Sequence, residues 1–484
     1  MDDVFRKKRA RIANGQPLRV LDLFSGCGGI SLGFQRAGFR IDAAVEFDEL
    51  SARSHALNFH GGDPRHAQAR DITQVEPEDL SADLNLGPCD QAFDVLVGGP
   101  PCQAYARVGR AKLREIAVHP EAFKVDGRAN LYLRYLHYVR ATKPLAILME
   151  NVPDIMNFGG HNIVQEIADV LEEMGYVARY TLRNAAFYGV PQMRDRVFLI
   201  AYHRSLGCTP EFPEPTRFVR LPPGYSGTRA VAFKHLDMFN GGAFTPEAQG
   251  DSSLPYAITA SEAIGDLAPI TLHIEGLLKR GARRFDQVTP YPLFNDLSDF
   301  ALMMREWPGF ENTEGLKDHV IRYLPRDTDI FRHMRHGDEY PAAHATAVRL
   351  FEKEVARRER RGEPMGKSKR DELFAKMVPP YPIHNFPNRW WKLRPDEPSR
   401  TLLAHIGKDT YSHIHYDSDQ ARTISVREAA RLQSFPDGFV FCGTMNPAFR
   451  QIGNAVPPVM AWRLAESIRT AIEGAIASRR AKVA

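Results

Sequence analysis

The sequence predicts an α/β protein built on a doubly wound, mostly parallel sheet, with an irregular second domain inserted into it. Through the first 200 residues, short apolar runs alternate with segments of helical periodicity, a pattern typical of parallel sheets. From about Thr209 this alternation gives way to prolines, aromatic residues and irregular polar stretches. A glycine-rich turn after the first apolar run is the third indication, because such a turn joins a strand to a helix at many ligand sites.

The predicted elements follow from these patterns in chain order. Residues 19–24, 41–46, 93–97, 145–150 and 197–201 are short apolar runs and are predicted to be strands. Residues 30–37, 49–59 and 161–174 have helical spacing. Later in the chain we expect a helix over 342–361, short strands within 390–417, and helices over 425–433 and 458–476. The predicted domains are therefore 1–205, 206–411, and a return to the first domain over 412–484.

Composition restricts the class of protein. The chain is 43% hydrophobic and 25% charged, which is ordinary for a globular protein. No run approaches the roughly 18 apolar residues of a membrane span, and the N-terminus has no apolar signal core. The five cysteines are scattered and form no CxxC pair, which predicts neither a disulfide framework nor a zinc ribbon. We expect a cytoplasmic protein whose net charge of +4 is compatible with phosphate binding but does not establish it.

The turn SGCGG after the first predicted strand is expected to approach a ligand closely. Gly26 and Gly28 allow a sharp backbone turn, and Glu46 ends the second strand 20 residues after Gly26, where a carboxylate can bind ribose hydroxyls. The spacing is not GxGxxG, which disfavours a pyrophosphate and favours a ligand with ribose and adenine but no phosphate. From the pattern alone, a turn without a ligand and a dinucleotide enzyme remain alternatives.

Three further segments bring reactive side chains to predicted strand ends. Cys102 follows two glycines and two prolines; a free cysteine is most often a small buried residue, but strand ends in α/β enzymes are ligand sites. Glu150 ends another strand, where desolvation favours the protonated carboxyl, unless a salt bridge holds it. Gln192, Arg194 and Arg196 alternate on one face of an extended segment and could form an anion-binding edge, although solvation is the default for a single arginine.

A nucleophilic cysteine, a protonated glutamate and paired arginines suit one reaction of a cytosine ring. The ring is a poor electrophile, but a thiolate can add to carbon 6 when ring nitrogen 3 is protonated. Carbon 5 can then take a methyl group from a sulfonium donor. Loss of the carbon-5 proton, followed by loss of the thiol, restores the ring.

The chain resembles the DNA cytosine-5 methyltransferases, in particular those of prokaryotic restriction-modification systems. Six motifs carry the resemblance and occur in the order of that family: DLFSGCGG from Asp22, GGPPCQ from Gly98, ENVP from Glu150, YGVPQMRDRVFLIA from Tyr188, REAARLQSFPD from Arg427 and RQIGNAVPP from Arg450. Because they span nearly the whole chain in order, they are far more specific together than any one alone.

The resemblance implies a Rossmann-like fold that uses S-adenosylmethionine and no metal. It implies that Cys102 attacks carbon 6, that Glu150 is the acid at nitrogen 3, and that Arg194 and Arg196 hold the base and the surroundings of the cysteine. The implied cofactor residues are Phe24, Ser25, Gly26, Gly28, Glu46, Phe47, Asp71, Ile72, Pro101, Asn454 and Val456. The implied DNA contacts are Gln103, Arg107, Arg110 and Gln192, on a target base that is extruded from the duplex.

The resemblance also defines partners and alternatives. It implies a monomer that acts on double-stranded DNA of the nucleoid, with a separate cognate restriction endonuclease, and a target-recognition domain over 206–411. Within that domain, Trp390 and Trp391 are expected in a core and not as a stacking platform. The alternatives are a transfer-RNA cytosine-5 methyltransferase, a catalytically silent DNA-binding module and a nicotinamide-dependent dehydrogenase. One departure is Ala106, where the family usually carries a serine.

Overall fold

A computed structural model describes residues 3–101, 130–234, 236, 242–248, 250–277, 287–293, 296–407 and 411–483 of the 484-residue chain. The chain divides into two compact units. The first comprises Met1–Ala257, Val440–Cys442 and Ala455–Ala484, and the second Ile258–Phe439 and Gly443–Asn454. Within the described ranges, no helix is both long and apolar enough to span a membrane.

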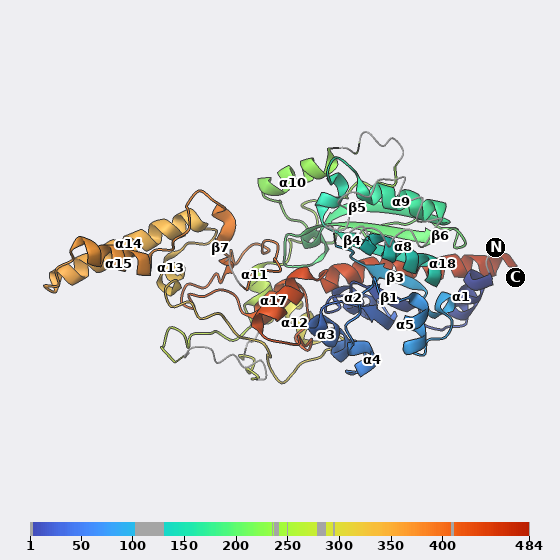
Figure 1. The fold of residues 1–484 in the computed structure, drawn as a ribbon, viewed down its shortest axis with the longest axis horizontal. Helices are drawn as coiled ribbons and strands as arrows, with labels where there is room; N and C mark the ends of the chain where they lie inside the picture. The colour runs from blue at the N-terminus through green and yellow to red at the C-terminus, as the bar shows by residue number, and fades with distance from the viewer. Residues whose placement is uncertain are drawn as a thin grey trace. The chain divides into compact units, whose positions relative to one another are not determined.

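The first unit is built on a six-stranded sheet with the order β2-β1-β3-β4-β6-β5 (Figure 1). Neighbours from β2 to β4 pair in parallel, whereas β6 runs antiparallel to both β4 and β5. The strands are β1 (Arg19–Leu23), β2 (Arg40–Val45), β3 (Val95–Gly98), β4 (Ala146–Asn151), β5 (Tyr176–Asn184) and β6 (Asp195–His203). The predicted α/β class with a mostly parallel sheet is confirmed.

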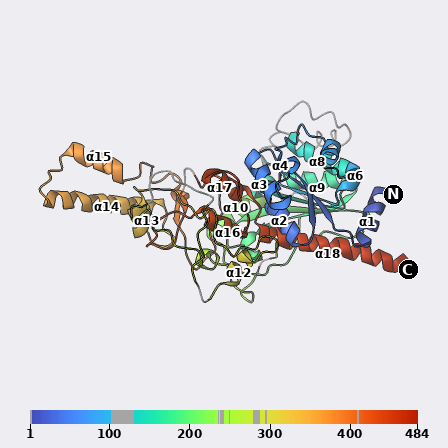
Figure 2. The ribbon, with the colours of Figure 1, turned by 90° about the horizontal axis from the view of Figure 1, so that it is seen from below.

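Helices cover both faces of this sheet, with α2 and α18 on one side and α8 and α9 on the other (Figure 2). Gly33 allows α18 to cross α2 closely, since a Cβ there would lie 2.6 Å from Ala461 Cβ. The last helix, α18, therefore packs on the first βα unit, whereas residues 412–439 and 443–454 of the predicted return segment belong to the second unit. The helical segments are α1 (Asp3–Ala13), α2 (Gly29–Arg36), α3 (Glu49–Phe59), α4 (Pro64–Ala67), α5 (Pro77–Asp83), α6 (Cys89–Ala92), α8 (Asn130–Thr142), η3 (Pro153–Asn157), α9 (Ile163–Glu173), η4 (Ala185–Tyr188), α10 (Pro223–Phe233) and α18 (Pro458–Val483).

The second unit has short helices, long connections and one two-stranded parallel pair, β7 with β8. Trp390 is 1% exposed and packs on Phe331, Tyr340 and Tyr411, as the core prediction required. Trp391 is half-buried, with the guanidinium carbon of Arg400 3.4 Å from its ring centroid. The elements are α11 (Ala260–Ile264), α12 (Asp299–Arg305), α13 (Thr328–His333), α14 (Tyr340–Arg360), α15 (Lys367–Met377), η6 (Pro387–Arg389), β7 (Trp390–Lys392), β8 (Tyr411–Ile414), α16 (Val426–Leu432) and α17 (Met445–Asn454).

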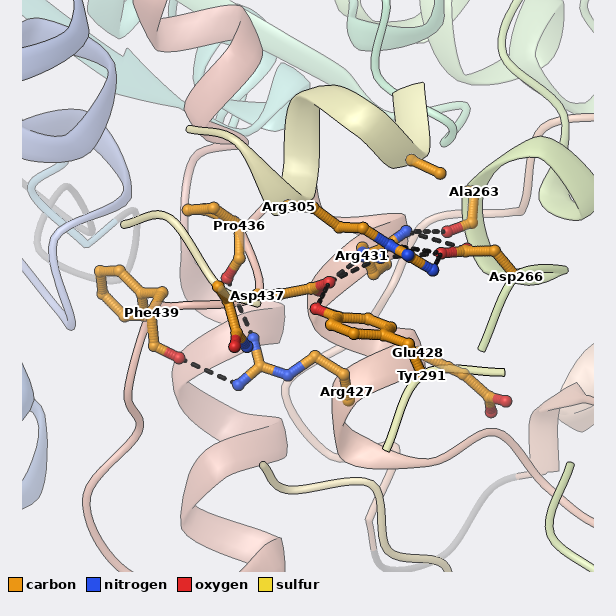
Figure 3. Close-up of polar contacts among 12 residues, drawn as sticks. Ala263, Asp266, Tyr291, Arg305, Arg427, Glu428, Arg431, Pro436, Asp437 and Phe439 are labelled. Atoms are coloured by element: carbon orange, nitrogen blue, oxygen red, sulfur yellow. Dashed lines mark hydrogen bonds and ion pairs between the residues drawn. The ribbon is translucent and has the colours of Figure 1, made fainter. Parts of the chain in front are cut away.

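A buried ion network around α16 organises the second unit (Figure 3). Arg431 forms two contacts of 2.6 Å with the carboxylate of Asp437 and contacts of 3.1 and 3.2 Å with Asp266. Arg305 also binds Asp266, and Tyr291 donates its hydroxyl hydrogen to Asp437 at 2.6 Å. Burial alone would raise the pKa of Asp437, but the Arg431 guanidinium holds it below its ordinary value.

Arg427, one turn before Arg431 on the same helix, is fully buried as well. Its guanidinium donates to the carbonyl oxygens of Pro436 and Phe439, both at 3.0 Å, and lies 3.4 Å from the carboxylate of Asp318. Groups inside the motif REAARLQSFPD (Asp437 and the Pro436 carbonyl) and outside it (Asp266, Asp318 and the Phe439 carbonyl) therefore bind its two arginines, and these side chains hold the loop that follows α16.

Replacing Arg431 with methionine leaves Asp266 and Asp437 buried without their shared cation. We expect the unfolding free energy at neutral pH to fall by about 3–5 kcal/mol, measured by thermal or denaturant unfolding. The pKa of Asp437 is lowered in the folded state, so the stabilising contribution is present above the unfolded-state pKa of about 3.9 and is lost as the pH falls. The destabilisation by Arg431→Met should therefore shrink in acid, and an equal loss at all pH values would contradict this account.

Candidate active site

The candidate site lies at the carboxyl ends of the parallel strands in the first unit. Leu23 pairs in register with Val45 on one side and with Gly98 on the other, and Gly98 pairs with Met149. The residues that follow these four positions consequently meet at one edge of the sheet. In open α/β sheets this edge is where ligands bind.

The turn between β1 and α2 uses backbone conformations that favour glycine. Gly26 has φ 56° and Gly28 has φ 103°, and Phe24 also lies in the left-handed region with φ 58°. The Gly28 N–H donates to Ser25 O at 3.0 Å, and Gly28 caps α2 without a side-chain hydrogen bond. The sharp turn predicted from the sequence is confirmed.

Glu46 is held rigidly against this turn. One carboxylate oxygen accepts from Gly26 N–H at 2.8 Å and the other accepts from Asp48 N–H at 2.7 Å. Burial raises the pKa of Glu46, while these two N–H groups oppose the rise. The side chain of the next residue, Phe47, is 75% exposed, so an apolar ring faces solvent next in sequence to the fixed Glu46 carboxylate.

The loop after β2 is tied to the same edge. Arg70 N–H donates to Glu46 O at 2.7 Å, which brings Asp71 close to the carboxyl end of β2. Asp71 accepts from the N–H and the hydroxyl of Thr73 at 2.9 and 2.8 Å. Ile72 differs from its neighbours because its side chain is 4% exposed and belongs to the hydrophobic core.

The remaining predicted cofactor residues lie in different places. A Cβ on Gly29 would overlap Val456 O, so the backbone at Val456 contacts the start of α2. Ser25 is buried in the turn and Pro101 is exposed. Asn454 is exposed at the end of α17, in the second unit, and its cofactor role stays a prediction.

Glu150 lies beside the turn that leads to Cys102. A Cβ on Gly99 would lie only 3.0 Å from Glu150 Oε2, and Asn151 donates its side-chain N–H to Pro100 O at 2.7 Å. Arg196 Nε lies 2.8 Å from Glu150 Oε1, and the two side chains are 15% and 12% exposed. Of the two alternatives left open for this carboxyl group, the structure shows the salt bridge.

The other two side chains of the predicted polar edge are buried. Arg194 is 1% exposed and donates to Ala455 O at 3.3 Å, and Gln192 is fully buried. Burial and the nearby Arg196 guanidinium lower the pKa of Arg194 well below its ordinary value. Because Gln192 is enclosed, its predicted contact with DNA requires a change in its surroundings, and that contact stays a prediction.

Helix α10 braces this edge and was not predicted from the sequence. Arg229 binds Asp195, the residue between Arg194 and Arg196, through two contacts of 3.0 and 2.8 Å, and it binds Glu247 at 2.7 Å. On the same helix, Tyr225 donates its hydroxyl hydrogen to Met193 O at 2.6 Å. The segment PPGYSGTRAVAF contains two prolines and two glycines, so its helical pattern was weak.

A buried polar group beneath the glycine turn was also missed. Ser31 donates to Asp22 Oδ2 at 2.7 Å and lies 3.0 Å from His55 Nε2. Burial raises the pKa of Asp22 to about 7 and lowers that of His55 well below its ordinary value. Among the described residues, Asp22 Oδ1 and His55 Nδ1 have no hydrogen-bond partner. Only the pairing of α2 with α3 in space could have identified this group.

Several predicted residues lie outside the described residues: Cys102, Gln103, Ala106, Arg107 and Arg110. The described ranges contain no group of three or more His, Cys, Asp or Glu side chains that could hold a metal ion.

A glycine turn, a fixed carboxylate and an exposed ring lie at the carboxyl edge of a mostly parallel sheet, the edge at which α/β enzymes bind their ligands. The model of the family "C-5 cytosine-specific DNA methylase" matches residues 18–269 and 311–470. The chain belongs to this family and is a DNA cytosine-5 methyltransferase.

Relatives support this membership over nearly the full chain. "Putative type II methyltransferase M.OihORF3336P" of Oceanobacillus iheyensis is 38% identical over 464 residues, which cover 94% of this chain and 96% of that protein. Type II methyltransferase M.AgeI of Thalassovita gelatinovora is 28% identical over 94% of this chain and 100% of its own. The fold is similar to that of a crystal structure of a "putative DNA modification methyltransferase" from an E. coli prophage, with a TM-score of 0.56 and 22% identity over 94% of this chain and 99% of that chain.

Replacing Gly99 with alanine should lower methyl-transfer activity and leave the melting temperature largely unchanged. The added Cβ, 3.0 Å from Glu150 Oε2, pushes the carboxylate away from Arg196, and we expect methyl transfer to fall by about tenfold or more, equivalent to about 1.4 kcal/mol in the barrier. Gly98→Ala should instead lower the melting temperature, because its Cβ would overlap the Leu23 carbonyl oxygen. Gly474→Ala, with open space around it, is the control. Full activity of Gly99→Ala would refute the role given to this contact.

Asp22→Asn should change the pH dependence of stability. The folded-state pKa of Asp22 is raised to about 7, so the folded chain binds more protons than the unfolded chain between about pH 4 and pH 7 and loses stability as the pH rises. The asparagine variant lacks this loss, so its melting temperature relative to the wild type should increase across that interval. Asp79→Asn, at an exposed position of α5, is the matched control for loss of a carboxylate. A constant difference for Asp22→Asn would contradict the assignment.

Proposed function

We propose that this enzyme methylates carbon 5 of an extruded cytosine in a specific DNA sequence through a covalent adduct between Cys102 and carbon 6. One observation carries the proposal: the turn that leads to Cys102 lies directly against Glu150, which Arg196 holds at 2.8 Å. This pairing puts a carboxylate and a guanidinium group against the backbone of Gly99, three residues before the predicted nucleophile in the sequence. Extrusion is a physical requirement, because a base stacked in a duplex offers no face to a thiol.

Each chain residue has a defined part in the proposed reaction. The Cys102 thiolate adds to carbon 6 while Glu150 holds a proton at ring nitrogen 3, so that the negative charge is not left on the ring. Arg196 orients the Glu150 carboxylate through its Nε. After carbon 5 has gained the methyl group, a base removes the carbon-5 proton and the bond between sulfur and carbon 6 breaks, which regenerates the thiolate.

The glycine turn at Gly26–Gly28, Glu46 and Phe47 form what we call the cofactor cradle. This cradle fits S-adenosylmethionine, which supplies an electrophilic methyl group when bound. Glu46 can accept hydrogen bonds from ribose hydroxyls, since each of its oxygens keeps a lone pair beyond the contacts with Gly26 and Asp48. Phe47 can stack on adenine because its ring is exposed. Asp71 and the backbone at Ile72 are proposed to contact the adenine edge, with Phe24, Pro101, Asn454 and Val456 completing the pocket.

The biological setting is proposed from the relatives. Relatives over nearly the whole chain are named type II methyltransferases, which favours a modification enzyme paired with a separate restriction endonuclease. We propose that it acts as a monomer on nucleoid DNA and that target recognition lies within residues 206–411. The unit boundary at Ala257 falls inside that segment.

The covalent mechanism can be tested by trapping. Duplex fragments of the host genome that contain 5-fluorocytosine cannot lose a proton from carbon 5, so the wild type with S-adenosylmethionine should form an adduct that survives denaturation. Cys102→Ala should form none, and Glu150→Gln should form it more slowly by roughly 10²-fold, within the usual range for a general acid. Cys208→Ala is the matched control and should trap normally. Equal trapping by Cys102→Ala would refute the mechanism, and bisulfite sequencing of DNA from an expressing host would identify the target.

A further inference from the structure

The second unit carries a helical hairpin formed by α14 and α15, which lie side by side (Figure 1). The hairpin has its own apolar contacts, with the rings of Phe351 and Phe374 5.2 Å apart and Val355 and Leu373 buried. Its helices are joined by residues 361–366. Because these contacts hold the two helices together, the side chains near the connection are presented on a defined scaffold.

The hairpin tip, defined as residues 357–370, carries a local excess of positive charge. Its sequence, RRERRGEPMGKSKR, holds seven Lys or Arg and two Glu, a net charge of +5. The whole chain has a formal net charge of +4, so the other 470 residues together are net −1. The tip is therefore strongly basic for its length, as is the segment 6–11 of the first unit, which also carries five cations.

Some of these cations are engaged within the hairpin and others face water. Arg357 and Arg358 both pair with Glu354, at 2.7 and 2.8 Å. In contrast, the exposed side chains of Arg361, Lys367 and Lys369 form no ion pair with a described carboxylate. These three side chains are available to an anionic partner. Arg370 lies 3.8 Å from Glu359, but both side chains are about half exposed, so this weak surface pair leaves Arg370 accessible as well.

Helix stability does not account for this arrangement. The helix dipole favours cations in the last turn of α14 but disfavours them in the first turn of α15. That first turn nevertheless carries Lys367, Lys369 and Arg370, no acidic residue, and no side-chain hydrogen bond at its N-cap, Gly366. Cations placed where they cost helix stability indicate a partner outside the hairpin.

We propose that the hairpin tip binds backbone phosphates of duplex DNA through Arg361, Lys367, Lys369 and Arg370. This inference rests on the proposed function, which supplies DNA as the polyanion. Exposed Lys and Arg on a helical scaffold attract phosphates regardless of sequence, so the tip contributes affinity and not base recognition. The buried arginines of α16 cannot serve this purpose, because Asp266, Asp437 and backbone carbonyls already bind them.

The test uses the full-length protein and a duplex of random sequence, about 40 base pairs long so that several turns of phosphates are offered. Four substitutions, Arg361→Gln, Lys367→Gln, Lys369→Gln and Arg370→Gln, remove the cations from the tip. Binding is measured by fluorescence anisotropy at several salt concentrations. The slope of log affinity against log salt should become smaller by about 3 to 4, since each phosphate contact contributes about 0.9.

Two controls separate this site from net charge and from misfolding. Arg6→Gln, Lys7→Gln, Arg204→Gln and Arg479→Gln remove the same charge from exposed positions of the first unit and should leave the slope unchanged. Exchanging Lys for Arg and Arg for Lys at the four tip positions keeps the charge and should also keep the slope. A wild-type slope for the tip variant, or an equal loss in the first-unit control, would overturn the inference, as would a stronger effect on single-stranded RNA than on duplex DNA.

A separate measurement distinguishes failure of the inference from failure of the proposed function. Methyl incorporation from S-adenosylmethionine into host genomic DNA is assayed with the wild type and the tip variant. Incorporation by both proteins with unchanged salt slopes would refute the tip as a DNA contact and leave the proposed function intact. Absence of incorporation by the wild type would refute the proposed function, whatever the slopes show.

Discussion

The close approach of three strand ends at Gly98 and Gly99 is the constraint on which the active-site edge depends. A side chain at Gly98 would overlap the carbonyl oxygen that ends β1, and one at Gly99 would crowd the carboxylate that ends β4. Because neither residue has a side chain, the turn that leads to Cys102 lies between the glycine turn of β1 and Glu150. The proposed cofactor cradle and the proposed catalytic carboxylate, Glu150, are thus brought to opposite sides of one short backbone segment.

The antiparallel strand β6 then supplies the charges that this edge requires. Glu150 pairs in register with Phe198, so Arg196, two residues earlier, reaches the carboxylate from the adjacent strand. Removing a guanidinium and a carboxylate from most of their water is costly for each alone and less so when they pair, so these two partly buried groups orient each other. Arg229 pairs with Asp195 in the same way, and this pair fixes the backbone between Arg194 and Arg196.

The sequence was most informative where local pattern determines structure. The apolar runs that became β1 to β4 and β6, and the glycine turn with Glu46 after it, follow from residue type and short spacing. Strand β5 was missed because its sequence, YVARYTLRN, contains no continuous apolar run like those of the predicted strands, and α10 because prolines and glycines obscure its periodicity. The choice between a salt-bridged and an isolated Glu150 depends on which strand lies beside β4. That pairing joins residues almost fifty positions apart, and no local pattern specifies it.

Charge in this protein has two separate uses, and net charge alone does not reveal either. Arg427 and Arg431 are buried and bound by carboxylates and carbonyls, so these motif arginines organise loops and cannot neutralise phosphates. The hairpin tip does the reverse, exposing cations in a helix turn where they lower helix stability. The net charge of the whole chain counts the buried arginines and the exposed cations alike, so it shows only that the protein is mildly basic. Sorting each cation by its burial and by its partners is therefore what separates the internal scaffold from a surface suited to a polyanion.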